Sequence, residues 1–220
     1  MPNPKDVLEA IRQGDTPQLE SLLASDGGLA SARDENGVSA LMQAAYQRRP
    51  EMVQLLRSKK DSLDVFEAAS LGDEARLSAL LAADPSLAHA WSVDGFTALH
   101  FTAFFRQPAC ARVLLAGGAD AAAVARNPMA VTPLHSAAAS RASDIASLLL
   151  ENGAAVDARQ QGGWTALHAA AMHGDEALVD LLLSRGADPA LKAENGSDAF
   201  TLAQEKGHES LAGKLRPRQS

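Results

Sequence analysis

The residues Thr97-Ala98-Leu99-His100 form a motif that recurs along the chain as Thr132–His135 and as Thr165–His168. The three copies begin 35 and 33 residues apart, and a weaker copy, Ser39–Met42, begins 58 residues before the first. Self-similarity at a spacing of about 20 to 50 residues is typical of repeat proteins, in which each unit buries its apolar face against the next. The motif therefore predicts a repetitive fold.

The residues after each motif predict two helices per repeat. A patch of small residues comes first, as at Ala137–Ala138 and Ala170–Ala171, and a Leu-Leu pair follows, as at Leu149–Leu150 and Leu182–Leu183. Ala and Leu favour helix and β-branched residues are sparse, so strands should be rare. Proline falls in the expected first turn of several second helices, where its missing N–H does no harm: Pro17, Pro50 and Pro108.

This pattern resembles the ankyrin-repeat family, whose repeat is about 33 residues long, opens with Thr-Pro-Leu-His and ends with Gly-Ala-Asp. The chain has Gly-Ala-Asp at 118–120 and 186–188, and the resemblance covers nearly its whole length. It implies an all-α solenoid of about seven helix-turn-helix units with short hairpin fingers. It also implies a concave groove lined by the fingers and the first helices.

One small residue on each first helix divides the chain into seven units of a single ankyrin array, residues 1–220. These small residues are Ala10, Ala44, Ala68, Thr102, Ala137, Ala170 and Ala203. The approximate repeats are 1–33, 34–61, 62–91, 92–126, 127–159, 160–192 and 193–220. Polar residues at both ends suit the capping units that a repeat array needs.

Two irregularities interrupt the period. The segment near 58–63 has no room for a hairpin, so we expect a finger-less junction there, and the sequence leaves open whether the solenoid bends at it. Residues on its two sides match at an offset of 58, as Asp6–Ala10 matches Asp64–Ala68, which indicates that a terminal-type repeat was duplicated into the interior. The second irregularity is an enlarged finger, with two extra residues at Asn127–Ala130.

The resemblance assigns a structural role to the histidine and threonine of each motif. In ankyrin-like repeats this histidine bonds to backbone and to the threonine hydroxyl, and it ties adjacent hairpins together. The residues concerned are His100, His135, His168, Thr97, Thr132 and Thr165. Zinc needs its ligands about 2 Å from one ion, whereas neighbouring helices stack about 8–10 Å apart. We therefore expect no metal site in this row of histidines.

Aromatic residues mark the expected binding surface. In ankyrin-like repeats the hairpin residue before the threonine and the solvent side of the first helix line the groove. In this register the candidate partner-binding residues are Tyr46, Trp91, Phe96, Phe104, Phe105, Met129, Val131, Trp164, Met172 and His173. Exposed aromatic side chains are common interface anchors. We expect one strip running from Phe96 to Met172, with a rim of acidic turn residues that favours a basic or mixed partner surface.

Three further phenylalanines, Phe66, Phe101 and Phe200, fall at core-like positions instead. The single cysteine, Cys110, excludes an internal disulfide and suits a small buried core position.

Composition and charge exclude other classes of protein. The chain has 220 residues and a formal charge of −7, so its net field disfavours nucleic acid and anionic membranes. No run approaches the roughly 20 apolar residues of a membrane-spanning helix. The first residues lack the apolar stretch of a signal peptide, and we expect a cytoplasmic protein.

The sequence also predicts a function without chemistry. No phosphate-binding glycine loop, Ser-His-Asp arrangement or Cys-His cluster occurs at a meaningful spacing. We expect a non-catalytic protein–protein interaction module without a cofactor, monomeric alone, although self-association through the aromatic strip stays open. The alternative is a regulatory or inhibitory subunit held permanently on an enzyme, which a large apolar groove would favour. A small-molecule or metal-dependent enzyme would need a deep pocket with convergent polar groups, and the sequence offers none.

Overall fold

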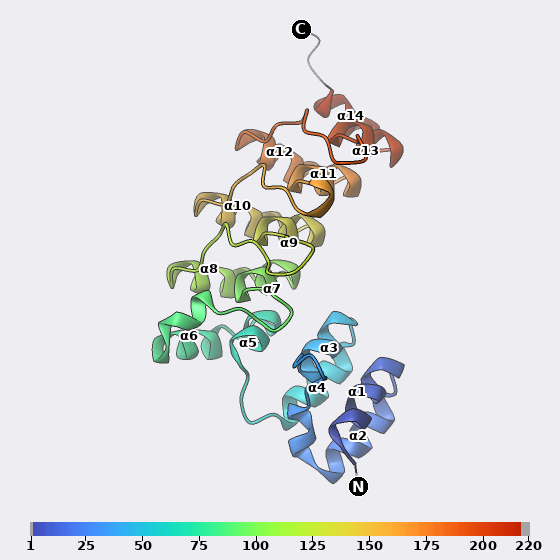
Figure 1. Ribbon diagram of the computed structural model, residues 1–220, viewed down its shortest axis with the longest axis vertical. Coiled ribbons are helices and arrows are strands. Elements are labelled where there is room, and N and C mark those ends of the chain that lie inside the picture. The colour runs from blue at the N-terminus through green and yellow to red at the C-terminus, as the bar shows by residue number, and fades with distance from the viewer. Residues whose placement is uncertain (1, 217–220) are drawn as a thin grey trace.

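The computed structural model describes residues 2–216, which form a solenoid of fourteen α-helices in seven pairs (Figure 1). Met1 and residues 217–220 of the predicted array lie outside the described residues. The first helices are α1 (Pro4–Gln13), α3 (Ala40–Tyr46), α5 (Val65–Leu71), α7 (Ala98–Phe104), α9 (Pro133–Ser140), α11 (Ala166–His173) and α13 (Ala199–Glu205). The second helices are α2 (Thr16–Ser25), α4 (Pro50–Lys59), α6 (Glu74–Ala83), α8 (Pro108–Ala116), α10 (Ser143–Glu151), α12 (Glu176–Ser184) and α14 (Glu209–Leu215).

The remaining regular structure is short. Three 3-10 helices occur, η1 (Gly27–Ser31), η2 (Pro85–His89) and η3 (Gln161–Gly163). Within residues 2–216, β-structure is limited to two isolated bridges, Arg33–Ser39 and Trp91–Thr97. The predicted all-α solenoid is therefore confirmed.

The motif threonines cap the N-termini of three first helices. Thr97, Thr132 and Thr165 are the N-caps of α7, α9 and α11, and in each capping box the third helical residue is the motif histidine. Five of the seven second helices, all but α10 and α14, begin with an aspartate N-cap or with proline in the first turn, and both suit a helix N-terminus.

The core is a continuous layer of alanine and leucine between the helices. The seven aligned small residues, from Ala10 to Ala203, are each 0% exposed, so the first helices approach one another closely. Leucines of the second helices close the layer from the other side and are also 0% exposed. They include Leu56, Leu114, Leu149 and Leu182.

The same element order occurs on either side of the junction. A helix pair, a 3-10 helix, a bridged hairpin and a second helix pair are found at α1–α4 and again at α5–α8. Equivalent residues keep the offset of 58: Asp26 caps η1 as Asp84 caps η2. The internal match in the sequence is thus also a match of structure.

The finger-less junction lies between the end of α4 at Lys59 and the start of α5 at Val65. Figure 1 shows α1–α4 to one side of the column that α5–α14 form. Helix α3 contacts α5 across the junction, but α4 and α6 do not stack as α6, α8, α10 and α12 stack on one another. The solenoid therefore steps sideways here, a point that the sequence left open.

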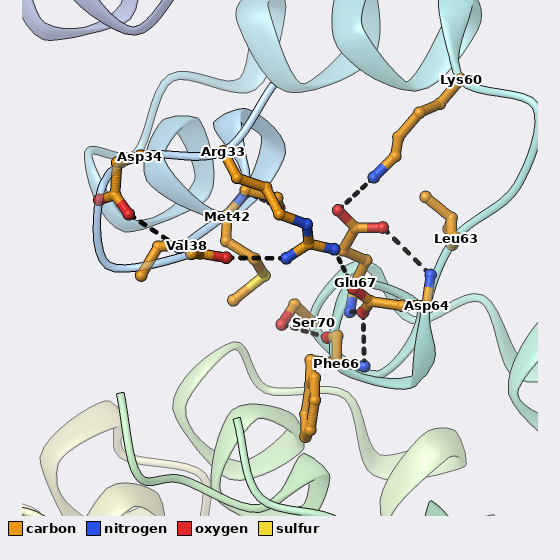
Figure 2. Close-up of polar contacts among 12 residues, drawn as sticks. Arg33, Asp34, Val38, Met42, Lys60, Leu63, Asp64, Phe66, Glu67 and Ser70 are labelled. Carbon is orange, nitrogen blue, oxygen red and sulfur yellow. Dashed lines mark hydrogen bonds and ion pairs between the residues drawn. The ribbon is translucent and has the colours of Figure 1, made fainter. Parts of the chain in front are cut away.

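A buried ion pair takes the place of the motif histidine at this step (Figure 2). Asp64 is the N-cap of α5, and Glu67 is its third residue, the position that His100 holds in α7. Glu67 Oε2 accepts a hydrogen bond from Asp64 N–H at 3.1 Å, and Glu67 Oε1 accepts one from Lys60 Nζ at 2.5 Å. The Glu67 side chain is 0% exposed and that of Lys60 is 8% exposed.

Exposed ion pairs also cross the junction. Arg33 Nη2 lies 3.0 Å from Asp64 Oδ2, and Arg57 Nη2 lies 3.0 Å from Asp73 Oδ2. Ion pairs that water reaches contribute little to stability, whereas removing one partner of a buried pair leaves an uncompensated charge. The buried pair is therefore the polar contact on which the junction most depends.

We predict that Lys60→Met destabilises the fold by about 3–5 kcal/mol, because it leaves the Glu67 carboxylate buried without its cation. Urea unfolding followed by circular dichroism measures the loss. The double variant Lys60→Met/Glu67→Gln should recover much of it. Lys59→Met is the matched control, since Lys59 is exposed at the end of α4. Equal stability of the Lys60 and Lys59 variants would contradict the assignment.

Candidate protein-binding groove

An aromatic cluster lies at the junction, centred on Phe101 of α7. Phe101 is 3% exposed, and its ring centroid lies 6.3 Å from that of Tyr46, 5.9 Å from that of Phe66 and 5.8 Å from that of Phe96. These rings come from α3, α5 and the hairpin before α7. The cluster therefore joins the two sides of the step, and Phe101 occupies the core position that the sequence predicts.

Two further rings extend this cluster to the surface. Phe105 lies 6.0 Å from Tyr46 and packs edge-on against Phe104 at 5.1 Å, measured between ring centroids. Phe104 is 42% exposed, whereas Phe105 is half-buried. Edge-to-face aromatic pairs at these distances are favourable, so Phe104 is held in place although it faces solvent.

A hollow of about 200 Å³ opens over these rings, and we call it the cup. Its lining is apolar apart from the Tyr46 hydroxyl, one imidazole and one serine. The lining residues are Tyr46, Phe96, His100, Phe101, Phe104, Met129 and Ser136. Met129, in the enlarged finger, is 47% exposed at its edge.

The enlarged finger is tied to both of its neighbours. On one side Arg126 N–H donates to Gly95 O at 2.8 Å, and Asn127 Nδ2 donates to Asp94 O at 2.9 Å. On the other side Gln161 N–H donates to Met129 O at 2.9 Å. A Cβ at Gly95 would lie 2.7 Å from the Arg126 carbonyl oxygen, so this contact requires glycine. Met129 is therefore presented by an anchored loop.

A hydrogen bond across the step fixes Tyr46. Its hydroxyl donates to Asp94 Oδ2 at 2.6 Å, and the two residues belong to different sides of the junction. Burial and, to a lesser extent, this carboxylate raise the pKa of Tyr46 far above its ordinary value. The phenol thus stays protonated as a donor.

The motif histidines link successive units through the same geometry. His100 Nε2 donates to Val131 O at 3.1 Å, because a carbonyl oxygen can only accept, and His135 Nε2 donates to Trp164 O at 3.2 Å. The other ring nitrogen of His100 accepts from the Thr97 hydroxyl at 2.8 Å. Burial lowers the pKa of His100 to about 4 and also lowers the pKa of His135. Both rings are therefore neutral at pH 7.

The third motif histidine departs from this pattern. His168 Nδ1 accepts from the Thr165 hydroxyl at 2.8 Å, but Nε2 has no hydrogen-bond partner among the described residues. Burial again lowers the pKa of this histidine. His168 thus caps its own helix without the link to the next finger.

The structure divides the predicted strip. Tyr46, Phe96, Phe104 and Met129 line the cup, and Phe105 packs beside it. Trp164, Met172 and His173 do not line the cup, because they belong to the unit beyond the enlarged finger, which lies between. The Trp164 ring instead packs 5.7 Å from the His168 ring.

Two other predicted residues take supporting places. Trp91 lies under the Arg126 guanidinium, 4.2 Å from its ring centroid, and lines a neighbouring hollow at the junction. Val131 is half-buried and contributes its carbonyl to His100. The sequence did not indicate Asp94, Arg126 or Ser136, since nothing in the local pattern links them to rings 30 or more residues away.

Chemical features elsewhere are few. No group of three or more His, Cys, Asp or Glu residues within 2–216 is arranged to hold a metal ion. No helix in the same range is long and apolar enough to cross a membrane. Cys110 is buried in α8, and this burial raises the pKa of its thiol to about 11.

Tyr46 is the chain's one tyrosine, so an alkaline absorbance titration observes it alone. We expect no phenolate signal near pH 10–11 while the protein is folded. Because the pKa of Tyr46 is raised in the folded protein, its contribution to the free energy of unfolding is fully present below about pH 10 and is lost as the pH rises further. Asp94→Asn removes the carboxylate that accepts from the Tyr46 hydroxyl, so the Tyr46 phenol should ionise at a lower pH than in the wild type. Half-titration near pH 10 in the folded protein would contradict the Tyr46–Asp94 bond.

The motif histidines predict acid sensitivity. Burial depresses the pKa of His100 in the folded protein to about 4. The contribution of this residue to the free energy of unfolding is therefore fully present above about pH 6.5 and is lost as the pH falls. Linkage gives a loss of about 2 kcal/mol between pH 7 and pH 4.5 from this residue. Urea unfolding at both pH values checks this, with His100→Gln as the comparison. The same pH dependence in the variant would rule out His100 as a source.

Comparisons with known proteins agree with this architecture. A family model described as ankyrin repeats in three copies matches residues 65–160, and one described as an ankyrin repeat matches residues 162–194. The E3 ubiquitin-protein ligase KEG of Arabidopsis thaliana is 29% identical over 173 residues, which cover 69% of this chain and 10% of that protein. The probable E3 ubiquitin-protein ligase XBOS31 of Oryza sativa subsp. japonica is 42% identical over 97 residues, 44% of this chain and 21% of that protein.

This chain thus spans a small part of both relatives. The two family models, by contrast, together match more than half of it. The matched residues contain the capped helix pairs, the linked fingers and the buried motif histidines described above. The chain belongs to the ankyrin-repeat family.

Proposed function

We propose that this chain binds a partner protein across its concave groove, with the cup as the centre of the contact. The ankyrin repeats indicate a protein–protein interaction module, and such an array is itself non-catalytic. The observation that supports binding at this place is the apolar cup, at whose edge Phe104 is 42% exposed and Met129 is 47% exposed.

The rigidity of the cup supports this assignment. Phe104 is held by Phe105, which packs on Tyr46, and Met129 is held by the anchored finger. Apolar side chains that are already ordered lose little conformational entropy when a partner covers them. Clusters of this kind form the energetic centres of protein interfaces, where a partner side chain fills a desolvated pocket.

The size of the cup favours reversible recognition over a permanent subunit. Obligate interfaces bury large, apolar surfaces that resemble a divided core. Here the exposed large apolar side chains of the described residues are four, and two of them, Val93 and Val124, lie outside the cup. The alternative of a regulatory or inhibitory subunit held on an enzyme would require a larger patch.

The names of the relatives favour one setting for this recognition. Both are called E3 ubiquitin-protein ligases, and the matched segment is a minor part of each. An ankyrin array in such a setting would select a protein while another part of the assembly carries the chemistry. Ubiquitin-transfer activity that co-purifies with the captured partner would support this setting.

We predict that Phe104→Asp/Met129→Asp abolishes partner capture from the lysate of the source cells, because charge in the cup prevents an apolar contact. The readout is quantitative mass spectrometry of proteins retained by the immobilised chain. Both residues are exposed, so circular dichroism should remain unchanged. Val124→Asp is the matched control: Val124 is 52% exposed, lies outside the cup and should leave capture intact. A partner that survives the double substitution would place binding elsewhere.

A further inference from the structure

Three of the turns within helix pairs hold arginine in a left-handed backbone conformation. Arg48, Arg106 and Arg141 have φ values of 54°, 59° and 58°. The other four pairs have glycine in the equivalent turn, at Gly14, Gly72, Gly174 and Gly207. L-residues other than Asn and Asp rarely adopt this conformation, because Cβ comes too close to the following carbonyl. Arginine at these three positions therefore carries a conformational cost that glycine avoids.

The same three arginines line one depression. It measures about 790 Å³ and lies where the turn between α3 and α4 faces those of α7–α8 and α9–α10 across the junction. A fourth arginine, Arg49, also lines it, and no aspartate or glutamate does so among the described residues. We call this depression the arginine cleft. A carboxylate-free group of four arginines contrasts with the net charge of −7 of the whole chain.

The arginines are only partly engaged by the protein itself. Arg141 Nη2 donates to His173 O at 2.8 Å, and Arg49 Nε donates to Gln47 Oε1 at 3.1 Å. The exposed side chains of Arg48 and Arg106 make no hydrogen bond or ion pair with the described residues. Other arginines near the junction pair with carboxylates, as Arg33 pairs with Asp64.

The cleft adjoins the cup. Phe104 lines both the cleft and the cup, and Phe105 lines the cleft. A ligand that lies along the cleft can therefore place an apolar side chain in the cup. The sideways step creates this arrangement, because it sets the α3–α4 turn opposite α7 (Figure 1).

We propose that the arginine cleft binds an acidic segment of the partner protein, with its carboxylates on Arg48 and Arg106 and a neighbouring apolar side chain in the cup. Guanidinium groups recognise carboxylates through paired, charge-assisted hydrogen bonds. The arginines are spread over turns of three units and alternate with apolar surface, which suits an extended peptide better than a small anion. This inference rests on the proposed function and reverses the partner charge that the sequence suggested, since four arginines and no carboxylate line the cleft.

Arg48→Gly/Arg106→Gly tests the inference. The probe is a fluorescein-labelled peptide of about a dozen residues, Asp and Glu around a central Leu-Leu pair, followed by fluorescence anisotropy. We expect binding to the wild type, at least tenfold weaker binding to the double variant, and little binding of the same peptide with Asn and Gln. Raised salt should weaken binding, because charge dominates the contact.

Thermal unfolding separates a binding role from a structural one. Glycine relieves the left-handed strain, so the melting temperature should rise by about 2–4 °C per substitution while affinity falls. Arg48→Asn/Arg106→Asn is a second variant that tolerates the turn and lacks the charge. Lys59→Gln/Arg112→Gln removes two exposed charges elsewhere and should leave binding unchanged. A loss of stability in the glycine variant would mean that the arginines are structural.

The remaining outcomes assign the cleft differently. Equal binding of the acidic peptide to wild type and glycine variant would overturn the inference. So would displacement of the peptide by millimolar inorganic phosphate or by phosphatidylserine vesicles, which would assign a general anion site. If Phe104→Asp/Met129→Asp abolishes partner capture while the acidic peptide fails to bind wild type, the proposed function stands and the arginine cleft alone fails.

Discussion

The units of α7 and α9 are each joined to the next unit by a hydrogen bond from a buried side chain at the third residue of the first helix. In α7 and α9 that residue is a neutral histidine, which reaches the carbonyl of the following finger. At the junction Glu67 holds the same helical position in α5, but its partner is Lys60 from the segment before α5 and not the finger that follows. The sideways step lies where no hairpin precedes α5, and this ion pair is the buried polar contact at that place.

The step explains where the aromatic residues gather. Of the nine Phe, Trp and Tyr residues in the chain, seven lie at the junction, and Trp164 and Phe200 lie elsewhere. Alanine and leucine fill the space between regularly stacked units. Larger rings are needed where the stacking is displaced, and the outermost of them, Phe104, remains partly uncovered. A packing solution at an irregular interface thus supplies the exposed apolar surface.

The repeat motif predicted the helix pairs, the threonine–histidine contacts and the aligned small residues of the first helices, because these depend on contacts within one unit or between regular neighbours. It also grouped Phe96 with Phe104 and Phe105, which are close in sequence. It could not join Tyr46 to Asp94, 48 residues away, since that bond exists only because of the step. For the same reason it could not show that Met172 lies outside the cup, or that Arg48 and Arg106 line one depression.

From the finger 91–97 onward, each finger is linked to the next by a backbone hydrogen bond, which Arg126, Gln161 and Glu194 donate in turn. No such bond joins the finger 33–39 to the finger 91–97 among the described residues. In a repeat array, stability is approximately the sum of the intrinsic stabilities of the repeats and of the interfaces between neighbouring repeats. This array therefore contains one interface of a different kind, which relies on side chains alone. We expect α1–α4 and α5–α14 to separate there first on unfolding, in which case the surface formed between them exists only while the two blocks are docked.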